Sequence, residues 1–305
     1  MVRDLHERTA LRGLTRRTLE ALRTFGVLAG LVCLCRTLGH ERALAVLAHG
    51  GALAGGFGLA IASFACYAAR FRASMRCASL ELGFGATFRL CARALFHHCF
   101  VPLSVGNDLS RFLLARAARP GVAPGRIARA IVGDHAIGTG ALLLLAAAGA
   151  GVFVDAGWWP LLGLAAGGIL VSAGALLPLQ RPAGSRRRLA QLLARRRAIA
   201  EALLCSLVMQ ALLAGAIHVV ADAAGLAAPW HVVLAVNACG SLLQVVPFNV
   251  AGLHLGDVAA TGLYVWLGLP LGDGLVLGSL AYVARLSVAL VGGVLDAVPR
   301  AAAGA

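Results

Sequence analysis

The sequence predicts an all-α integral membrane protein: a polytopic helical bundle with internal repeats, for which an inverted arrangement is preferred, and with re-entrant or broken helices. Three observations carry this prediction. The 305 residues are 60% hydrophobic and 13% charged, with a mean hydropathy of +0.84, whereas soluble domains are about a quarter charged. The basic residues gather in a few stretches of the chain. Finally, proline-containing breaks interrupt apolar segments in both halves, a pattern typical of transporters built from repeats.

Nine apolar segments are candidates for membrane helices, which need about 20 residues to cross the hydrocarbon. They cover residues 22–39, 43–69, 82–103, 127–153, 157–179, 199–221, 229–247, 258–271 and 273–297. The first 21 residues are polar and arginine-rich and lack the apolar core of a signal peptide, so we expect a cytoplasmic lead-in and a retained first span. The predicted organisation is a lead-in (1–21), a first membrane half (22–180), a basic cytoplasmic loop (181–198), a second membrane half (199–298) and a short tail (299–305).

The charge of the chain indicates its orientation. All 27 basic residues are arginines, and the formal net charge is +14. Positively charged loops stay cytoplasmic, so we place Arg181–Arg197, which holds seven arginines, on that side. Cytoplasmic basic loops explain the charge without nucleic-acid binding. The eight cysteines form no CxxC pair and the adjacent His97 and His98 lack a third spaced ligand, so we expect packing cysteines, an interfacial histidine pair, no metal and no cofactor.

Residues 82–110 conflict with a simple crossing. The flanking stretches 70–76 and 116–129 are both basic, so both are expected in the cytoplasm. About 29 residues are too few for two crossings of roughly 20 residues each, which predicts a re-entrant hairpin or a broken helix. Arg89 and Arg93 in this segment are expected to face protein or water. The break from Pro102 to Asp108, which includes Gly106, is therefore a candidate cavity wall.

The break has a counterpart in the second half. Val101–Gly106 (VPLSVG) recurs as Val246–Ala251 (VPFNVA), each copy follows an apolar segment, and an aspartate, Asp108 or Asp257, follows each within a few residues. Coincidence in a valine-rich chain is the alternative. A duplication would place Pro102 and Gly106 opposite Pro247 and Gly252 as paired interruptions around a site in the middle of the membrane.

Four short motifs occur in order along the chain. They are Pro102 to Arg111 with Gly106-Asn107-Asp108; Asp134-His135 with Gly138; Pro247 with Gly252 to Asp257; and Arg285 with Gly292-Gly293. In this order the chain resembles the lysylphosphatidylglycerol synthetase transmembrane family, in its flippase-like form without the synthase, over about residues 20–298. Asn107 and His254 stand where that family has glycine, His135 where it has arginine, and Asp257 where it has glutamate.

The resemblance implies flippase-like translocation of an anionic or headgroup-modified lipid between leaflets of the bacterial inner membrane, by a multi-pass protein with a cytoplasmic N-terminus. A membrane lipid is the expected substrate and a separate lipid-synthesis enzyme the expected partner. We expect no enzymatic activity, because the chain leaves no room for a synthase domain. Neither an ATP-binding loop nor a nucleophile–base pair is recognisable in the sequence.

The candidate substrate-binding residues are the ionisable and polar groups of the four motifs. They are Asn107, Asp108, Arg111, Asp134, His135, His254, Asp257 and Arg285. Arg111 and Arg285 would hold phosphate, since guanidinium groups bind it with paired hydrogen bonds, and the aspartates would shape a polar path.

Each of these residues also has a structural interpretation. Asp108 would pair with Arg111, Asp134 with an arginine of residues 111–129, and Asp257 with Arg285. His135 would titrate near neutral pH if transport is coupled to protons. Two other functions stay open: a lipid-binding accessory protein that does not transport, and a membrane enzyme that uses the aspartates as bases. The sequence leaves the lipid, the direction of movement and the oligomeric state open.

Overall fold

The computed structural model describes residues 47–100, 106–149, 196–245, 249–250 and 253–297. Several predictions lie outside these residues. They are the spans 22–39 and 157–179, the basic loop up to residue 195, and the break residues Pro102, Pro247 and Gly252.

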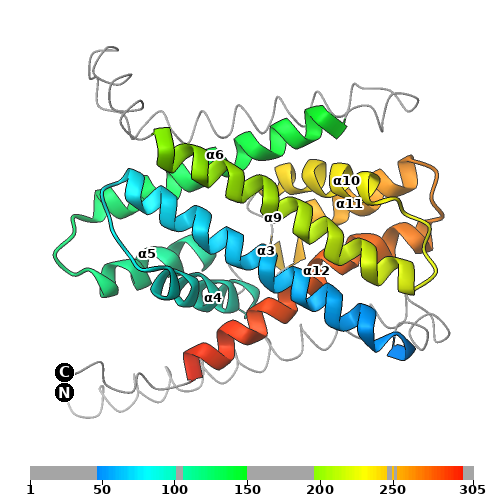
Figure 1. Cartoon of the computed structure of the whole chain (residues 1–305), viewed down its shortest axis with the longest axis horizontal. Helices are drawn as coiled ribbons and strands as arrows, with labels where there is room; N and C mark the ends of the chain where they lie inside the picture. Colours follow the sequence, from blue (N-terminus) through cyan, green and yellow to red (C-terminus); the bar gives the residue numbers. More distant parts are fainter. Residues whose placement is uncertain (1–46, 101–105, 150–195, 246–248, 251–252, 298–305) are drawn as a thin grey trace, which may run out of the picture.

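The described residues form a bundle of helices (Figure 1). The helices are α3 (Gly50–Cys77), α4 (Phe84–Phe100), α5 (Gly106–Ala118), α6 (Pro124–Ala148), α9 (Arg196–Ala223), α10 (Trp230–Leu242), the short 3-10 helix η3 (Leu243–Val245), α11 (Leu255–Trp266) and α12 (Leu271–Ala297). Two short strands, β1 (Asn249–Val250) and β2 (Leu253–His254), pair antiparallel between η3 and α11. Helices α3, α6, α9 and most of α12 are long and apolar enough to cross a membrane, so the chain is an all-α membrane protein.

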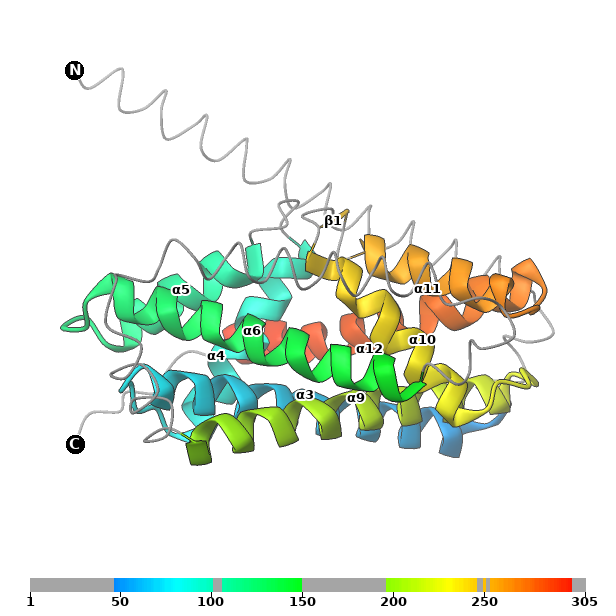
Figure 2. The same ribbon diagram turned by 90° about the horizontal axis from the view of Figure 1, so that it is seen from above.

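Helices α3 and α9 pack antiparallel along their length. The Ser63 hydroxyl donates to the Met209 carbonyl at 2.8 Å, Arg76 pairs with Glu201 nearer the end of α3, and Gly56 lies against Val220 nearer its start. Figure 2 shows these two helices together on one side of the bundle, with α5 and α11 on the other side and at opposite ends. All four long helices therefore run between the same two ends of the bundle (Figure 1).

The order of elements is the same in the two halves of the chain. A long helix (α3 or α9) is followed by a shorter one (α4, or α10 with η3), a break, a second short helix (α5 or α11) and another long helix (α6 or α12). The packing partners correspond as well, because α4 packs on α12 and α10 packs on α6. Likewise α5 contacts α6 as α11 contacts α12.

One end of the bundle is basic. The start of α4 and the end of α5 both lie there, because Arg119 donates to the Glu81 carbonyl and Arg126 donates to the carbonyls of Ala78 and Ser79. Helix α9 also begins at this end, next to the Arg76–Glu201 pair. The opposite end holds loops 224–229 and 267–270, in which no arginine occurs. The start of α4 and the end of α5 thus lie at the same end of the bundle.

Helix α3 extends beyond the predicted segment 43–69 and continues to Cys77. The arginines of its last two turns each have a partner. Arg70 pairs with Asp134, Arg72 donates to the Leu82 carbonyl and Arg76 pairs with Glu201. The predicted segment 258–271 was also displaced, since α11 ends at Trp266 and Gly268 has a φ of 93°, a conformation that favours glycine.

The contact between α4 and α12 depends on Gly292. A Cβ atom at this position would overlap the Ala92 carbonyl, and one at Gly293 would lie 2.7 Å from the Phe96 ring. We expect Gly292→Ala to lower the free energy of unfolding by about 1–3 kcal/mol, as overpacking does. Gly262→Ala is the matched control, because nothing lies within 4 Å of a Cβ there. Reversible unfolding in mixed detergent micelles measures both variants, and equal destabilisation by the two would contradict the tight contact.

Candidate active surface: two polar clusters beside the breaks

Two groups of ionisable side chains lie next to the two breaks in the helices. The Asp134 cluster consists of Arg70, Asp108, Arg111, Asp134 and His135. The Asp257 cluster consists of His98, His254, Asp257 and Arg285. The first adjoins residues 101–105 and the second adjoins residues 246–252. Ionisable groups in apolar helices are costly and usually face protein or water, so these clusters are the candidate functional site.

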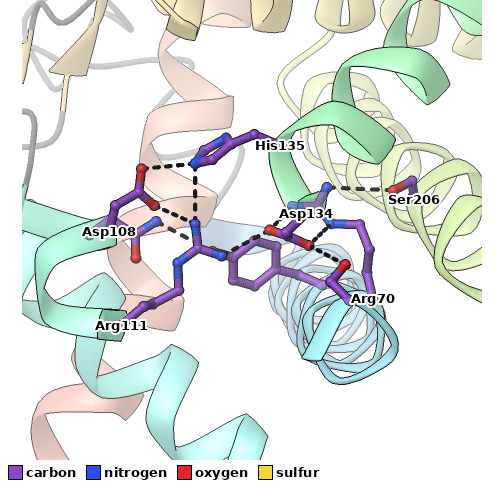
Figure 3. A network of polar contacts seen from close by, with 9 residues as sticks. Arg70, Asp108, Arg111, Asp134, His135 and Ser206 are labelled. Carbon is purple, nitrogen blue, oxygen red and sulfur yellow. Dashed lines mark hydrogen bonds and ion pairs between the residues drawn. The ribbon is translucent and has the colours of Figure 1, made fainter. Parts of the chain in front are cut away.

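Asp134 is fully buried on α6 and holds two arginines (Figure 3). Arg70, from α3, donates Nε and Nη2 to its two carboxylate oxygens at 2.8 and 3.0 Å. Arg111, from α5, donates Nη1 to Oδ2 at 2.9 Å. One carboxylate therefore ties three helices together, and these charge-assisted bonds offset the cost of burying the charges.

Arg111 is almost completely buried, with 1% of its surface exposed. Its guanidinium carbon lies 4.7 Å from the centre of the Phe71 ring and 5.7 Å from that of Tyr67, distances at which cation–π attraction operates. The group also donates Nη2 to Asp108. Its Nε has no hydrogen-bond partner among the described residues, so one donor of this guanidinium is still available.

The accessible edge of the Asp134 cluster is formed by Asp108 and His135. Their side chains are 41% and 56% exposed, in contrast to Arg111 and Asp134 beneath them. The Asp108 carboxylate contacts His135 Nε2 at 2.8 Å as well as Arg111 (Figure 3). A ligand that approaches this cluster would therefore meet Asp108 and His135 first.

Sequence reasoning missed Arg70. It lies at the end of a predicted span and was attributed to a cytoplasmic stretch. Gly138 is the residue in the sequence that could have indicated a bulky partner for Asp134, because it lies one helical turn after Asp134 and on the same face of α6. A Cβ at Gly138 would lie 2.8 Å from Arg70 Nη1, so this glycine makes room for the guanidinium.

In the second half, Arg285 and Asp257 form the predicted pair. Arg285 Nη1 and Nη2 donate to the two carboxylate oxygens of Asp257, both at 2.9 Å. Asp257 lies in the first turn of α11 and also accepts the backbone N–H of His254 at 2.8 Å. A carboxylate at this position is favoured by the exposed N–H groups and the dipole of the helix start.

His98 and His254 connect the two halves. His98 lies near the end of α4 and His254 ends β2, and both are buried. Their Nε2 atoms are 2.9 Å apart and their rings are stacked, so one ring donates a hydrogen bond to the other. His98, which was expected at the membrane interface, is buried because His254, 156 residues later in the chain, lies against it.

The structure brings the predicted site residues together in these two groups. Asn107 lies beside the first, and its Nδ2 donates to the Tyr67 hydroxyl at 3.3 Å. Gly106 begins α5, so the break predicted there ends at this residue. With neutral histidines, each cluster has as many carboxylates as guanidinium groups. Among the described residues, no group of three His, Cys, Asp or Glu side chains could hold a metal ion.

The arrangement offers hydrogen-bonding groups and charge at two adjacent breaks. No family model matches this chain, and no curated protein or solved structure is detectably similar to it. The geometry of the two clusters therefore carries the functional argument.

Proposed function

We propose that this chain moves an anionic or headgroup-modified lipid between the leaflets of a bacterial inner membrane, as the family that it resembles does. The observation that carries the proposal is the pair of polar clusters at the two breaks, the second of which joins the two halves because His98 of α4 contacts His254. A lipid headgroup cannot cross hydrocarbon without polar partners. The clusters would supply such partners while the acyl chains stay in the surrounding lipid.

The two halves are proposed to be an inverted repeat. The recurring order of elements, the corresponding packing partners and the antiparallel contact of α3 with α9 all support this. Each half would then supply one pair of short helices, α4 and α5 or α10 and α11, that enters from its own end of the bundle. Sites between such repeats are exposed alternately to the two sides of a membrane.

Asp108 is the group that the lipid phosphate is proposed to replace on Arg111. It shares Arg111 with Asp134, but it is partly exposed whereas Asp134 is buried. A phosphate could therefore displace Asp108 from Nη2 and engage the unpartnered Nε while Asp134 keeps the guanidinium in place. Planar guanidinium groups bind phosphate through two such parallel donors.

The proposed orientation places the basic end of the bundle in the cytoplasm. Arg72, Arg76, Arg116, Arg119 and Arg126 lie in or beside the loops of that end, whereas loops 224–229 and 267–270, which the structure describes at the opposite end, have none. Basic residues close to membrane helices are retained on the cytoplasmic side. Trp230, which is exposed at the start of α10, would then mark the outer interface.

The test is leaflet exchange of fluorescent phosphatidylglycerol in proteoliposomes, measured by dithionite quenching at matched protein incorporation. We expect the wild type to exchange lipid faster than empty vesicles do. Asp108→Asn and His135→Gln should each slow exchange roughly tenfold, which corresponds to about 1.4 kcal/mol in the barrier. Both side chains are accessible, so the variants are expected to fold.

Glu201→Gln is the control for this measurement, because Glu201 belongs to a partly exposed pair with Arg76 between α3 and α9 and to neither cluster. Its exchange rate should equal that of the wild type. Exchange by the wild type no faster than in empty vesicles, across a panel of anionic lipids, would contradict translocation and favour the accessory, lipid-binding function.

A further inference from the structure

A cavity of about 430 Å³ lies between α4 and α5, outside both polar clusters. Leu82, Leu90 and Leu114 contribute apolar walls, and Arg89 and Arg93 contribute charge. The small residues Gly85, Ala86 and Ala118 complete the lining and leave the space open. A cavity with apolar walls and two guanidinium groups suits an amphipathic anion.

The two arginines share one face of α4, because they are four residues apart. Arg89 is exposed and has no hydrogen-bond or ion-pair partner among the described residues, unlike Arg70, Arg76, Arg111 and Arg285. Two guanidinium groups one turn apart can bind a phosphodiester together, each with paired donors. Their aliphatic stems would pack along the apolar walls.

The cavity lies at the basic end of the bundle, along the first turns of α4 and beside loop 78–83. His97 continues the same face one turn beyond Arg93, and His98 of the Asp257 cluster follows. One face of α4 thus carries two arginines near the basic end and a histidine nearer the first break.

The corresponding positions of the second half hold no arginine. The recurring VPLSVG and VPFNVA motifs are 145 residues apart, so Leu234 and Ala238 of α10 correspond to Arg89 and Arg93. This difference gives the two sides of the bundle different chemistry, although the order of their helices is the same.

We infer that the cavity between α4 and α5 is a binding site for an anionic phospholipid of the leaflet at the basic end, with Arg89 and Arg93 holding the phosphate. Its role as the entry point for transport depends on the proposed function, whereas the binding itself does not. The occupant is a lipid rather than a soluble phosphate, because three leucine side chains line the cavity.

Native mass spectrometry of the detergent-purified protein tests this binding. Dioleoyl phosphatidylglycerol, dioleoyl phosphatidylcholine and glycerol 3-phosphate are titrated in separate experiments. We expect the wild type to bind phosphatidylglycerol at least tenfold more tightly than phosphatidylcholine, and R89Q/R93Q to lose this preference. R116Q/R129Q removes the same charge from exposed arginines of α5 and α6 outside the cavity lining, and it should retain the preference.

Three results would overturn the site: equal loss of preference in both double variants, unchanged preference in R89Q/R93Q, or comparable affinity for glycerol 3-phosphate. R89K/R93K, which keeps the charge without the paired donors, should bind with intermediate affinity. Leaflet exchange separates this inference from the proposed function. If the wild type binds lipid selectively but does not exchange it, the site is retained and transport is rejected. If the wild type exchanges lipid and R89Q/R93Q binds phosphatidylglycerol as the wild type does, transport is retained and the site is rejected.

Discussion

Replacing Asp134 with alanine is expected to remove a large part of the free energy of unfolding of the protein. The substitution leaves Arg70 and Arg111 buried without the carboxylate that both of them contact. Removing one partner of a buried ion pair costs about 3–5 kcal/mol, which is a large part of the stability of a typical protein. Unfolding in mixtures of dodecyl maltoside and sodium dodecyl sulfate, followed by circular dichroism, measures the loss.

A second substitution distinguishes the lost charge from lost packing. In Asp134→Ala/Arg70→Met, the buried charge of α3 is removed together with its partner, while Arg111 keeps Asp108. We expect the double variant to be more stable than Asp134→Ala alone, because the two sites are in contact and their effects are not additive. Glu201→Ala should cost no more than about 1 kcal/mol, since the Arg76–Glu201 pair is partly exposed. Equal losses in the single and the double variant would show that the charge of Arg70 is not what Asp134 neutralises.

The sequence was sufficient to predict the ion pairs that join neighbouring elements. Asp108 and Arg111 are three residues apart on α5, and Asp257 and Arg285 lie on consecutive helices. The partner of Asp134 was expected within residues 111–129, and Arg111 is that partner. Local spacing and the cost of a charge in an apolar segment were enough for these three pairs.

Contacts between distant elements were not predictable in this way. Arg70 reaches Asp134 across 64 residues, and His98 meets His254 across 156. Neither residue interrupts an apolar pattern in a way that identifies its partner. The length of α3 was not predictable for the same reason, because an arginine that pairs with a distant aspartate is compatible with a helix that continues.

The Asp257–Arg285 pair offers the test that best separates a structural role from a functional one. Asp257→Asn and Arg285→Gln should each cost about 3–5 kcal/mol of stability, because each leaves a buried charge without its partner. The combined variant, Asp257→Asn/Arg285→Gln, contains no charge at either position. We expect it to recover most of that loss, since asparagine can still accept the His254 backbone N–H that Asp257 accepts and neutral groups are less costly to bury.

Leaflet exchange of the combined variant then identifies what the pair does. If the pair only holds α11 to α12, exchange should return together with stability. If Arg285 also contacts the lipid phosphate, the combined variant should fold and still exchange lipid at the rate of empty vesicles, because glutamine offers neither the charge nor the paired donors of a guanidinium. Arg285 is the more accessible member, with 16% of its side chain exposed against 3% for Asp257, which favours the second result. A stable variant with full exchange would assign Arg285 to structure alone and leave Arg111 as the phosphate-binding arginine of the two clusters.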